Sequence, residues 1–428
     1  MTAIIVQGDA RALQLPDESV DLIVTSPPYF ALRSYTDGGE HYAGQIGSEA
    51  TPQEFIAALV ECTREWMRVL KPSGSMFVNL GDKYGRNGGV DRKARGSTAG
   101  DPGGRAAPRL RQRVAGNDKS LMLLPERYRI ACVDDLGLIA RAVIVWSKPN
   151  GLPESVTDRV RRSHEDWVHL TKLPRYFAAV DEIREPTNIG ARPVQSWAER
   201  KAAGNITHAP DNGHSTGVGM APNPLGKLPG SVWEVASQPL TVPKELGIDH
   251  FAAFPTEWPR RIILGWSPSG ICVECGEGRR PRLDVDREHV DYSLAERRAT
   301  ERVDATQGAI TGGTKRSTLG HQTTRTITGY ACKCAEPTAA TRPAVVLDPF
   351  GGTGTTALVA SVLGRVGISV DLSGDYCRLA RWRTTDAKQL ERAQRPDRPR
   401  KQPSPPEPQP QWSQDEWLAH FAAQVTAS

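Results

Sequence analysis

The sequence predicts a doubly wound α/β fold with a mostly parallel sheet that is interrupted by irregular insertions. Three observations support this prediction. Short apolar strand patterns alternate with a helix pattern over the first eighty residues, and the alternation returns after residue 344. Stretches rich in Gly, Pro and polar residues, without periodicity, separate the regular parts. At 428 residues the chain is longer than most single domains, so we expect one elaborated core.

The first half of the core is predicted to begin with strands at residues 4–6 and 20–25. A helix over 52–70 follows, because Thr51 can cap it, Pro52 suits its first position, and apolar residues recur every three or four positions. The next strand is predicted at 75–80. Further elements are expected as a helix at 121–135, strands at 138–146 and 167–171, a strand at 345–348, a helix from 355 and a strand at 366–370.

Composition divides the chain into six segments. These are residues 1–182 as one half of the core with a basic loop at 82–119, 183–240 as an irregular module, 241–266 as a return to the core, 267–343 as a cysteine-bearing insertion, 344–394 as the other half of the core, and 395–428 as a Pro-rich tail.

The overall charge is mildly basic, with 54 Lys and Arg against 49 Asp and Glu, which suits a polyanionic partner without requiring one. The sequence contains no apolar run of about 18 residues and no secretory leader, so we expect a soluble, cytoplasmic protein without membrane contact. Seven cysteines in such a chain do not favour a disulfide scaffold.

Basic residues concentrate in the loop between Lys83 and Lys119, where ten Lys and Arg stand against three Asp. This composition fits two interpretations equally well. The loop is either a solvated, disordered excursion or an arm that contacts phosphates, and ordering on a nucleic acid would reconcile the two.

A Gly-rich turn follows the buried strand that ends at Asp348. Glycines allow a ligand to approach the backbone, and the following helix offers unpaired N–H groups. Gly352, Gly354 and Ala357 also fit the dinucleotide pattern G-x-G-x-x-A, so a tight structural turn and a nicotinamide site remain alternatives. The Asp348 carboxylate would repel a pyrophosphate but suits a cationic aminoacyl group such as that of S-adenosylmethionine, and Asp371 could hold ribose hydroxyls.

A rigid loop, Ser26–Tyr29, ends the strand at 20–25, on the sheet edge that carries ligands in this fold class. An exocyclic amino group on a base is a weak nucleophile. The Ser26 hydroxyl and the Pro27 carbonyl could accept its hydrogens and turn its lone pair toward a methyl donor. Tyr29 offers a face on which an extruded base can stack. The alternative is a rigid strand exit with a packed aromatic residue.

These two motifs together resemble the N4-cytosine and N6-adenine DNA methyltransferases, in the permuted arrangement where the catalytic loop precedes the cofactor loop. The resemblance covers most of residues 1–390. Further segments agree with it, namely Gly8-Asp9, Trp146–Asn150, His164-Glu165 and His250–Pro255.

The resemblance implies a sheet of the S-adenosylmethionine-dependent methyltransferase type, with S-adenosylmethionine as cofactor. It implies target recognition by residues 183–240, double-stranded DNA as partner, a homodimer as a further option, and a place in restriction-modification. The implied catalytic residues are Ser26, Pro27, Pro28 and Tyr29. The implied cofactor-binding residues are Asp9, Asp348, Phe350, Gly351, Gly352, Thr353, Gly354 and Asp371, with Asp371 where relatives often carry Glu.

The first residue of the catalytic loop bears on the target base. Ser26 stands where adenine-specific members commonly carry Asp, so the resemblance favours N4 of cytosine, with N6 of adenine as the alternative. No Pro-Cys nucleophile lies near the loop, which disfavours C5-cytosine chemistry. Two other classes stay open at this point, an NAD-dependent oxidoreductase and a catalytically silent DNA-binding protein.

Four cysteines could form a metal site in the insertion at 267–343. Cys272 and Cys275 have the usual C-x-x-C spacing, and Cys332 and Cys334 follow after 56 residues. Four thiolates suit a tetrahedral structural zinc ion, and free thiols are the alternative. The remaining cysteines, Cys62, Cys132 and Cys377, lie in apolar helical patterns and are expected in the core.

Overall fold

The computed structural model describes residues 2–31, 36–37, 40–41, 44–85, 118–151, 153–186, 225–248, 253–291, 319–334 and 339–395. The core and both insertions belong to one compact unit, Met1–Gln394. The predicted Pro-rich tail corresponds to a second unit, Arg395–Ser428, which lies outside the described residues apart from its first position.

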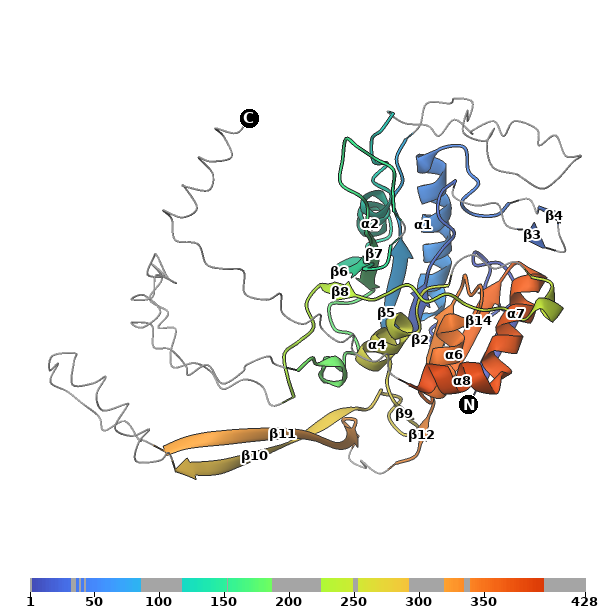
Figure 1. Cartoon of the computed structure of the whole chain (residues 1–428). Coiled ribbons are helices and arrows are strands. Elements are labelled where there is room, and N and C mark those ends of the chain that lie inside the picture. Colours follow the sequence, from blue (N-terminus) through green and yellow to red (C-terminus); the bar gives the residue numbers. More distant parts are fainter. Residues whose placement is uncertain are drawn as a thin grey trace, which may run out of the picture. The chain divides into compact units, whose positions relative to one another are not determined.

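The core is an eight-stranded sheet in the order β1-β14-β13-β2-β5-β7-β6-β8, which confirms the predicted mostly parallel sheet (Figure 1). The first five strands of this order, β1, β14, β13, β2 and β5, are parallel to one another. Strand β7 is antiparallel to both of its neighbours, β5 and β6, and β8 is parallel to β6. The strands are β1 (Thr2–Gln7), β2 (Val20–Thr25), β5 (Leu70–Leu80), β6 (Ile139–Ser147), β7 (His164–Thr171), β8 (Val232–Glu234), β13 (Val345–Asp348) and β14 (Val366–Asp371).

Helices cover both faces of this sheet, as the doubly wound fold requires. One apolar cluster joins a face of the sheet to α1 (Pro52–Val69) and α2 (Leu124–Asp134). A second cluster joins the other face to α4 (Glu257–Trp266), α6 (Thr355–Val362) and α8 (Ala387–Gln394). The remaining helix of the core, α7 (Gly374–Thr385), packs against β1 and β14.

The long helix α1 begins as predicted. Thr51 Oγ1 accepts from the Glu54 N–H at 3.2 Å, and the Glu54 carboxylate accepts from the Thr51 N–H at 3.0 Å, which forms a complete capping box. The end differs from the prediction, because β5 starts at Leu70 without a turn. Leu70 pairs with Val20 and Ser75 pairs with Leu22. A register shift between these pairs accommodates residues 71–74, which lie between the predicted helix and the predicted strand.

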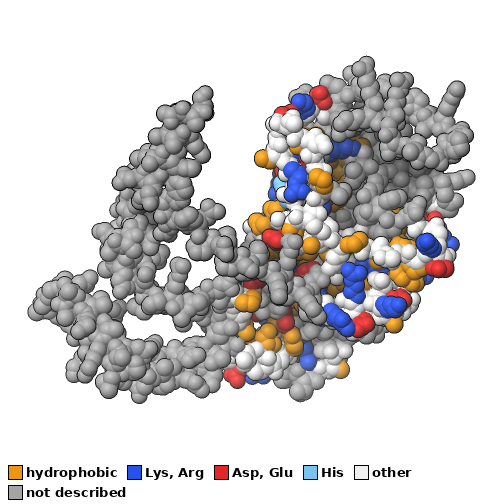
Figure 2. Space-filling model, viewed as in Figure 1, with side chains coloured by type: hydrophobic (Ala, Val, Ile, Leu, Met, Phe, Trp, Pro, Cys, Tyr) orange, Lys and Arg blue, Asp and Glu red, His pale blue; other side chains and the backbone are white. Residues whose placement is uncertain are grey.

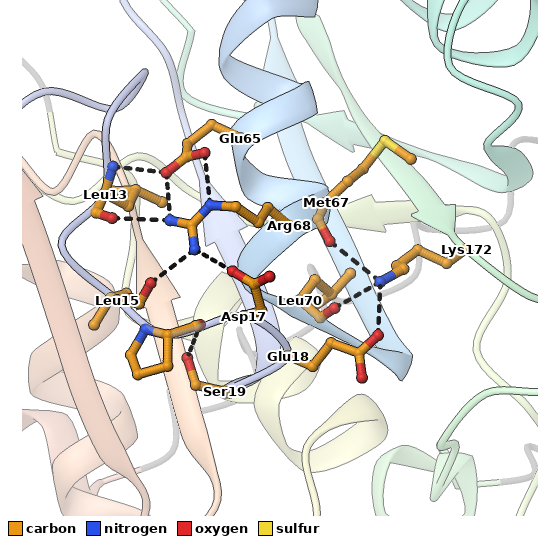
Figure 3. A network of polar contacts seen from close by, with 11 residues as sticks. Leu13, Leu15, Asp17, Glu18, Ser19, Glu65, Met67, Arg68, Leu70 and Lys172 are labelled. Carbon is orange, nitrogen blue, oxygen red and sulfur yellow. Dashed lines mark hydrogen bonds and ion pairs between the residues drawn. The ribbon is translucent and has the colours of Figure 1, made fainter.

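An arginine fastens the irregular segment between β1 and β2 to α1 (Figure 3). The Arg68 guanidinium donates to the carbonyls of Leu13 and Leu15 and pairs with Asp17 at 2.5 Å and Glu65 at 2.6 Å. Because an unpaired backbone carbonyl is costly in a folded protein, these contacts fix a stretch that has no regular structure of its own. The segment carries Asp9 and Ala10 into the ligand-bearing edge of the sheet.

The predicted module at 183–240 is not wholly separate from the core. Residues 187–224 lie outside the described residues, but β8 extends the central sheet, and Trp233 is buried and stacks on Trp258 with centroids 5.0 Å apart. Three residues are too few to show the alternation by which a strand is recognised in a sequence. The boundary of this module therefore lies before Val232 and not at residue 240.

The insertion at 267–343 was expected to be irregular and proves to contain a long antiparallel ribbon, β10 (Arg280–Asp291) with β11 (Leu319–Ala331). Its strands carry mostly charged residues and threonines, and the apolar alternation is limited to Leu283 and Val285, which is too short to mark a strand of this length in the sequence. Backbone pairing forms the ribbon instead. The remaining short elements are β3 (Thr36–Asp37), β4 (Glu40–His41), β9 (Ile271–Cys272), β12 (Thr341–Arg342) and two 3₁₀ turns, η2 (Val180–Ile183) and η3 (Lys244–Leu246). None of the described helices has the length and apolar character needed to cross a membrane.

Candidate active site

A large cavity of about 1490 Å³ lies at the carboxyl edge of the parallel strands. Both loops singled out in the sequence line it, since β2 and β13 are neighbours and their carboxyl ends meet at this edge. The lining residues that matter below are Asp9, Ser26, Pro27, Pro28, Tyr29, Asn79, Gly81, Lys148, Glu165, Phe350, Gly351, Gly352, Thr353, Thr355 and Asp371. The volume exceeds what a single drug-sized ligand needs and leaves room for two reactants.

The Gly-rich turn presents backbone to this cavity. A Cβ on Gly351 would lie 1.8 Å from Ser369 Oγ, so no larger residue fits there. Gly352 has a φ of +49° and its N–H donates to Asp371 at 2.8 Å. The other carboxylate oxygen of Asp371 accepts from the Ser373 N–H at 2.9 Å, and burial raises the pKa of Asp371 to about 6. The turn and the end of β14 thus form one rigid unit.

Asp348 lies in a different place from the one expected. Its side chain is buried, with 1% exposed, and is absent from the lining of the cavity. The carboxylate accepts from Thr356 Oγ1 at 2.8 Å and from the Phe350 N–H at 3.2 Å, and burial raises its pKa to about 6. Asp348 therefore holds the turn in shape from beneath. Gly354 is likewise outside the lining. It caps the start of α6 with a φ of +72°, and a Cβ at this position would lie 2.9 Å from Ala380 Cβ.

Asp9 and Phe350 both line the cavity. The Asp9 carboxylate pairs with Arg11 at 2.7 Å, and this hydrogen-bonded pair lowers the pKa of Asp9. Phe350 packs edge-on against Trp66 with centroids 5.8 Å apart, and Trp66 Nε1 donates to the Ala10 carbonyl at 3.1 Å. Trp66 therefore sets the spacing between the loop after β1 and the Gly-rich turn.

The Ser26–Tyr29 loop is tied to the neighbouring strand by Asn79, which sequence reasoning did not identify. Ser26 Oγ donates to Asn79 Oδ1 at 3.2 Å, and Tyr29 Oη donates to the same oxygen at 2.6 Å. Asn79 Nδ2 in turn donates to the Asp166 carbonyl at 3.2 Å, which fixes the amide orientation. Pro27 is buried, so the loop has little freedom to move.

Tyr29 is also held by Gly81 and Glu165. A Cβ on Gly81 would lie 2.8 Å from Tyr29 Cε2, so only glycine leaves room for this ring. Tyr29 Oη lies 2.7 Å from Glu165 Oε2, and Glu165 is paired with Lys148, whose ammonium sits over the Trp146 ring at 4.1 Å from its centroid. Lys148 and Glu165 lie in segments of the sequence that agree with the family resemblance, but the sequence assigns neither residue a role. Lys148 follows the carboxyl end of β6 and Glu165 lies at the amino end of the antiparallel strand β7, so only the strand directions, which the sequence does not give, bring both to this edge.

The four cysteines of the insertion come together as predicted. Cys272 and Cys275 lie at β9, and Cys332 and Cys334 follow β11, so the ribbon closes the 56-residue gap between the pairs. Their four sulfur atoms all lie within 4.8 Å of one another. The other three cysteines are buried in the core, and burial raises their thiol pKa to between about 11 and 12.

The basic loop is described only at its two ends. Lys83 donates to the Ala31 carbonyl and Lys119 pairs with Asp158 at 2.7 Å, whereas residues 86–117 lie outside the described residues. Figure 2 shows other basic side chains over α7 and α8, with acidic side chains among them. On α7, Arg378 pairs with Asp375 at 2.6 Å. That face therefore offers a mixed charge pattern rather than a phosphate track.

Comparison with known proteins identifies the class of protein. The family model N6_N4_Mtase, described as DNA methylase, matches residues 20–273 and 339–381. The chain is 33% identical to the type II methyltransferase M.SmaI of Serratia marcescens over 304 residues, 69% of this chain and 88% of that relative. It is also 33% identical to the type II methyltransferase M.Cfr9I of Citrobacter freundii over 273 residues, 63% of this chain and 75% of that relative.

Two solved structures resemble the fold more distantly. One is the PvuII DNA methyltransferase, described as cytosine-N4-specific, with a TM-score of 0.48, 15% identity and 92% of each chain covered. The other is a putative DNA modification methylase of Thermus thermophilus in complex with S-adenosyl-L-methionine, with a TM-score of 0.39, 18% identity, and 92% of this chain and 96% of that chain covered.

The chain belongs to the N6 and N4 DNA methylase family. It is a DNA methyltransferase that modifies an exocyclic nitrogen, N4 of cytosine or N6 of adenine. The alternative of an NAD-dependent oxidoreductase finds no support, although the Gly-rich turn alone would have allowed it.

Proposed function

We propose that this enzyme transfers a methyl group from S-adenosylmethionine to N4 of cytosine at a specific site in double-stranded DNA. The observation that carries the proposal is that Ser26–Tyr29 and the Gly-rich turn face one cavity. Ser26 at the head of the loop, in place of Asp, favours cytosine over adenine. The names of the type II relatives support a role in restriction-modification.

The cavity fits S-adenosylmethionine by several independent features. The turn at Gly351 and Gly352 has no side chain to obstruct a ligand, Phe350 offers an aromatic surface, and the Asp371 carboxylate faces the same space. These residues suit the nucleoside and its ribose hydroxyls. When bound, the cofactor supplies a sulfonium-activated methyl group.

The hydrogen bonds of the catalytic loop suit an amino-group substrate. Because Ser26 gives its proton to Asn79 Oδ1, its oxygen keeps lone pairs that can accept from an exocyclic N–H. The Pro27 carbonyl has no competing N–H within its own residue or the next, Pro28. Two such acceptors would orient the amino group with its lone pair exposed. Asn79 is therefore proposed to keep Ser26 in the acceptor role.

The target base is tested by mass spectrometry of hydrolysed DNA from a host that expresses the chain. The expected product is N4-methylcytosine, and none should appear in the same host expressing the Tyr29→Ala variant. N6-methyladenine as the sole modified base would refute the choice of cytosine while leaving the family assignment intact.

A structural zinc ion is proposed for Cys272, Cys275, Cys332 and Cys334. Four thiolates complete a tetrahedral site and leave no open position for a catalytic water. Sulfur atoms about 3.8 Å apart would follow from Zn–S bonds of about 2.3 Å, and the observed cluster within 4.8 Å needs little movement to reach this. The ion would join the start of β10 to the end of β11, which pair with each other at one end of the ribbon, and the ribbon has no apolar cluster of its own among the described residues.

Elemental analysis of protein purified without chelator tests the zinc proposal. We expect about one zinc per chain and near-complete loss of it in the Cys272→Ser, Cys275→Ser double variant, with faster proteolysis of residues 267–343. Cys62→Ser is a matched control that should keep its zinc. Less than about 0.2 zinc per chain in the parent, or equal protease resistance in parent and double variant, would contradict a structural site.

A further inference from the structure

A buried arginine lies directly beneath the cofactor turn. Arg383 of α7 is 5% exposed, and its Nη1 donates to Thr353 Oγ1 at 2.6 Å and to Thr355 Oγ1 at 2.7 Å. Among the residues that the structure describes, no carboxylate lies within ion-pair distance of Arg383. Its Nε is buried without a hydrogen-bond partner. The guanidinium is thus a buried charge without a described counter-ion.

Such a charge is costly in a folded protein, because desolvation of an ion is repaid only by a close opposite charge. Burial lowers the pKa of Arg383 to about 10, which still leaves the group protonated at neutral pH. A second arginine, Arg392, lines a small space together with Arg383, separate from the large cavity, and adds positive charge. The arrangement therefore favours an anion close to the Gly-rich turn.

The two threonines connect this charge to the cavity. A guanidinium can only donate, so both threonine oxygens act as acceptors toward Arg383. The two hydroxyls are 3.2 Å apart, so one can donate to the other and the remaining O–H is left to point elsewhere. Thr353 and Thr355 both line the cavity, and α6 begins at Thr355 with its unpaired N–H groups. All these groups favour negative charge at one spot.

We infer that Arg383 is a positioning residue that balances the carboxylate of the methionine part of S-adenosylmethionine, acting through Thr353 and Thr355. This inference rests on the proposed cofactor, which contains one carboxylate as its sole anionic group at neutral pH. Arg383 does not line the cavity itself, so it acts by polarising the two hydroxyls and by supplying charge from behind.

Calorimetric titration with two ligands tests the inference. S-adenosylhomocysteine has the carboxylate, whereas 5′-methylthioadenosine has the same nucleoside and lacks the whole aminoacyl group. The Arg383→Met variant should bind S-adenosylhomocysteine at least about tenfold more weakly and 5′-methylthioadenosine within about twofold of the parent, as loss of a charge-assisted contact predicts. Arg383→Lys, which keeps the charge, should retain part of the preference for S-adenosylhomocysteine. Arg378→Met, at an exposed position of the same helix, is the control and should match the parent.

Thermal unfolding without ligand separates this role from a structural one. Removal of an unbalanced buried charge should leave the melting temperature of Arg383→Met unchanged or higher, while the stabilisation by S-adenosylhomocysteine shrinks. A lower melting temperature together with an equal loss of affinity for both ligands would show that Arg383 has a structural role, and would overturn the inference. Unchanged affinity for S-adenosylhomocysteine would also overturn it. Failure of the parent itself to bind S-adenosylhomocysteine would instead contradict the proposed cofactor.

Discussion

Replacement of Tyr29 by alanine is expected to lower the turnover of methyl transfer by about 100-fold or more, with the affinity for S-adenosylmethionine changed less than about twofold. The reason is that Tyr29 is held at three points, by Asn79, Glu165 and Gly81, so that its ring has one fixed position beside Ser26. A base placed against it loses its support when the ring is removed. Single-turnover rates on duplex DNA and separate cofactor titrations measure the two effects.

Two conservative variants separate stacking from positioning. Tyr29→Phe keeps the ring and loses the Oη hydroxyl, whose single proton is shared between Asn79 and Glu165, so we expect an intermediate loss of about tenfold in turnover. Glu165→Gln keeps an acceptor for Tyr29 and leaves Lys148 without its charge partner, and it should also cause a smaller loss than Tyr29→Ala. Near-normal turnover of Tyr29→Ala on duplex DNA would remove the loop from the chemistry.

Replacement of Asp371 by asparagine is expected to weaken S-adenosylmethionine binding by about 10- to 100-fold at neutral pH, because hydrogen bonds to a charged acceptor contribute about 1.5–3 kcal/mol. The pKa of Asp371 is raised to about 6 by burial, so the parent should lose affinity as the pH falls through about 6 and the carboxylate becomes protonated. The variant should show a weaker pH dependence. Titrations between about pH 5 and 8 measure both.

The effect on folding has the opposite sign and serves as an internal control. The pKa of Asp371 is higher in the folded protein, at about 6, than its ordinary value of 3.8. Protonation of this carboxyl therefore stabilises the fold fully at pH values below 3.8, and this contribution is lost as the pH rises through about 6. Asp371→Asn should therefore remove this pH-dependent loss of stability in the ligand-free protein, and any stability that it costs at all pH values comes from the Gly352 or Ser373 N–H that the amide nitrogen cannot accept. Asp348 titrates in the same range, so a variant that keeps the full pH dependence would assign the effect to Asp348 and contradict the role of Asp371.

Local sequence patterns were sufficient to predict the core, and to predict that the Ser26–Tyr29 loop and the Gly-rich turn lie at the same edge of the sheet. Buried strands with polar residues at their carboxyl ends imply a shared edge in any parallel sheet, and Ser26 and Gly351 do share one cavity. The cysteine pairs were also predicted to meet. Thiolate pairs of this kind are recognisable without a fold, because their spacing alone suits one metal ion.

Contacts between distant segments were beyond local patterns. Asn79 and Gly81 appear in the sequence as the end of an ordinary strand, and their contacts with Tyr29 follow from the pairing of β2 with β5. The position of Asp348 depends on Thr356, which closes over its carboxylate from the first turn of α6. Arg383 carried no signal at all, since arginines in a helix are usually solvated. The ribbon β10–β11 escaped detection because charged residues and threonines outnumber the apolar residues in its strands.

The central claim is that the Ser26–Tyr29 loop methylates an exocyclic base nitrogen in the cavity it shares with the cofactor turn. The most direct test is transfer of tritium from S-adenosyl-L-[methyl-³H]methionine to duplex DNA by the purified chain, followed by chromatography of the released nucleosides. We expect label in N4-methylcytosine, and almost none when the Tyr29→Ala variant replaces the parent. Label in 5-methylcytosine, or equal label with parent and variant, would contradict the claim.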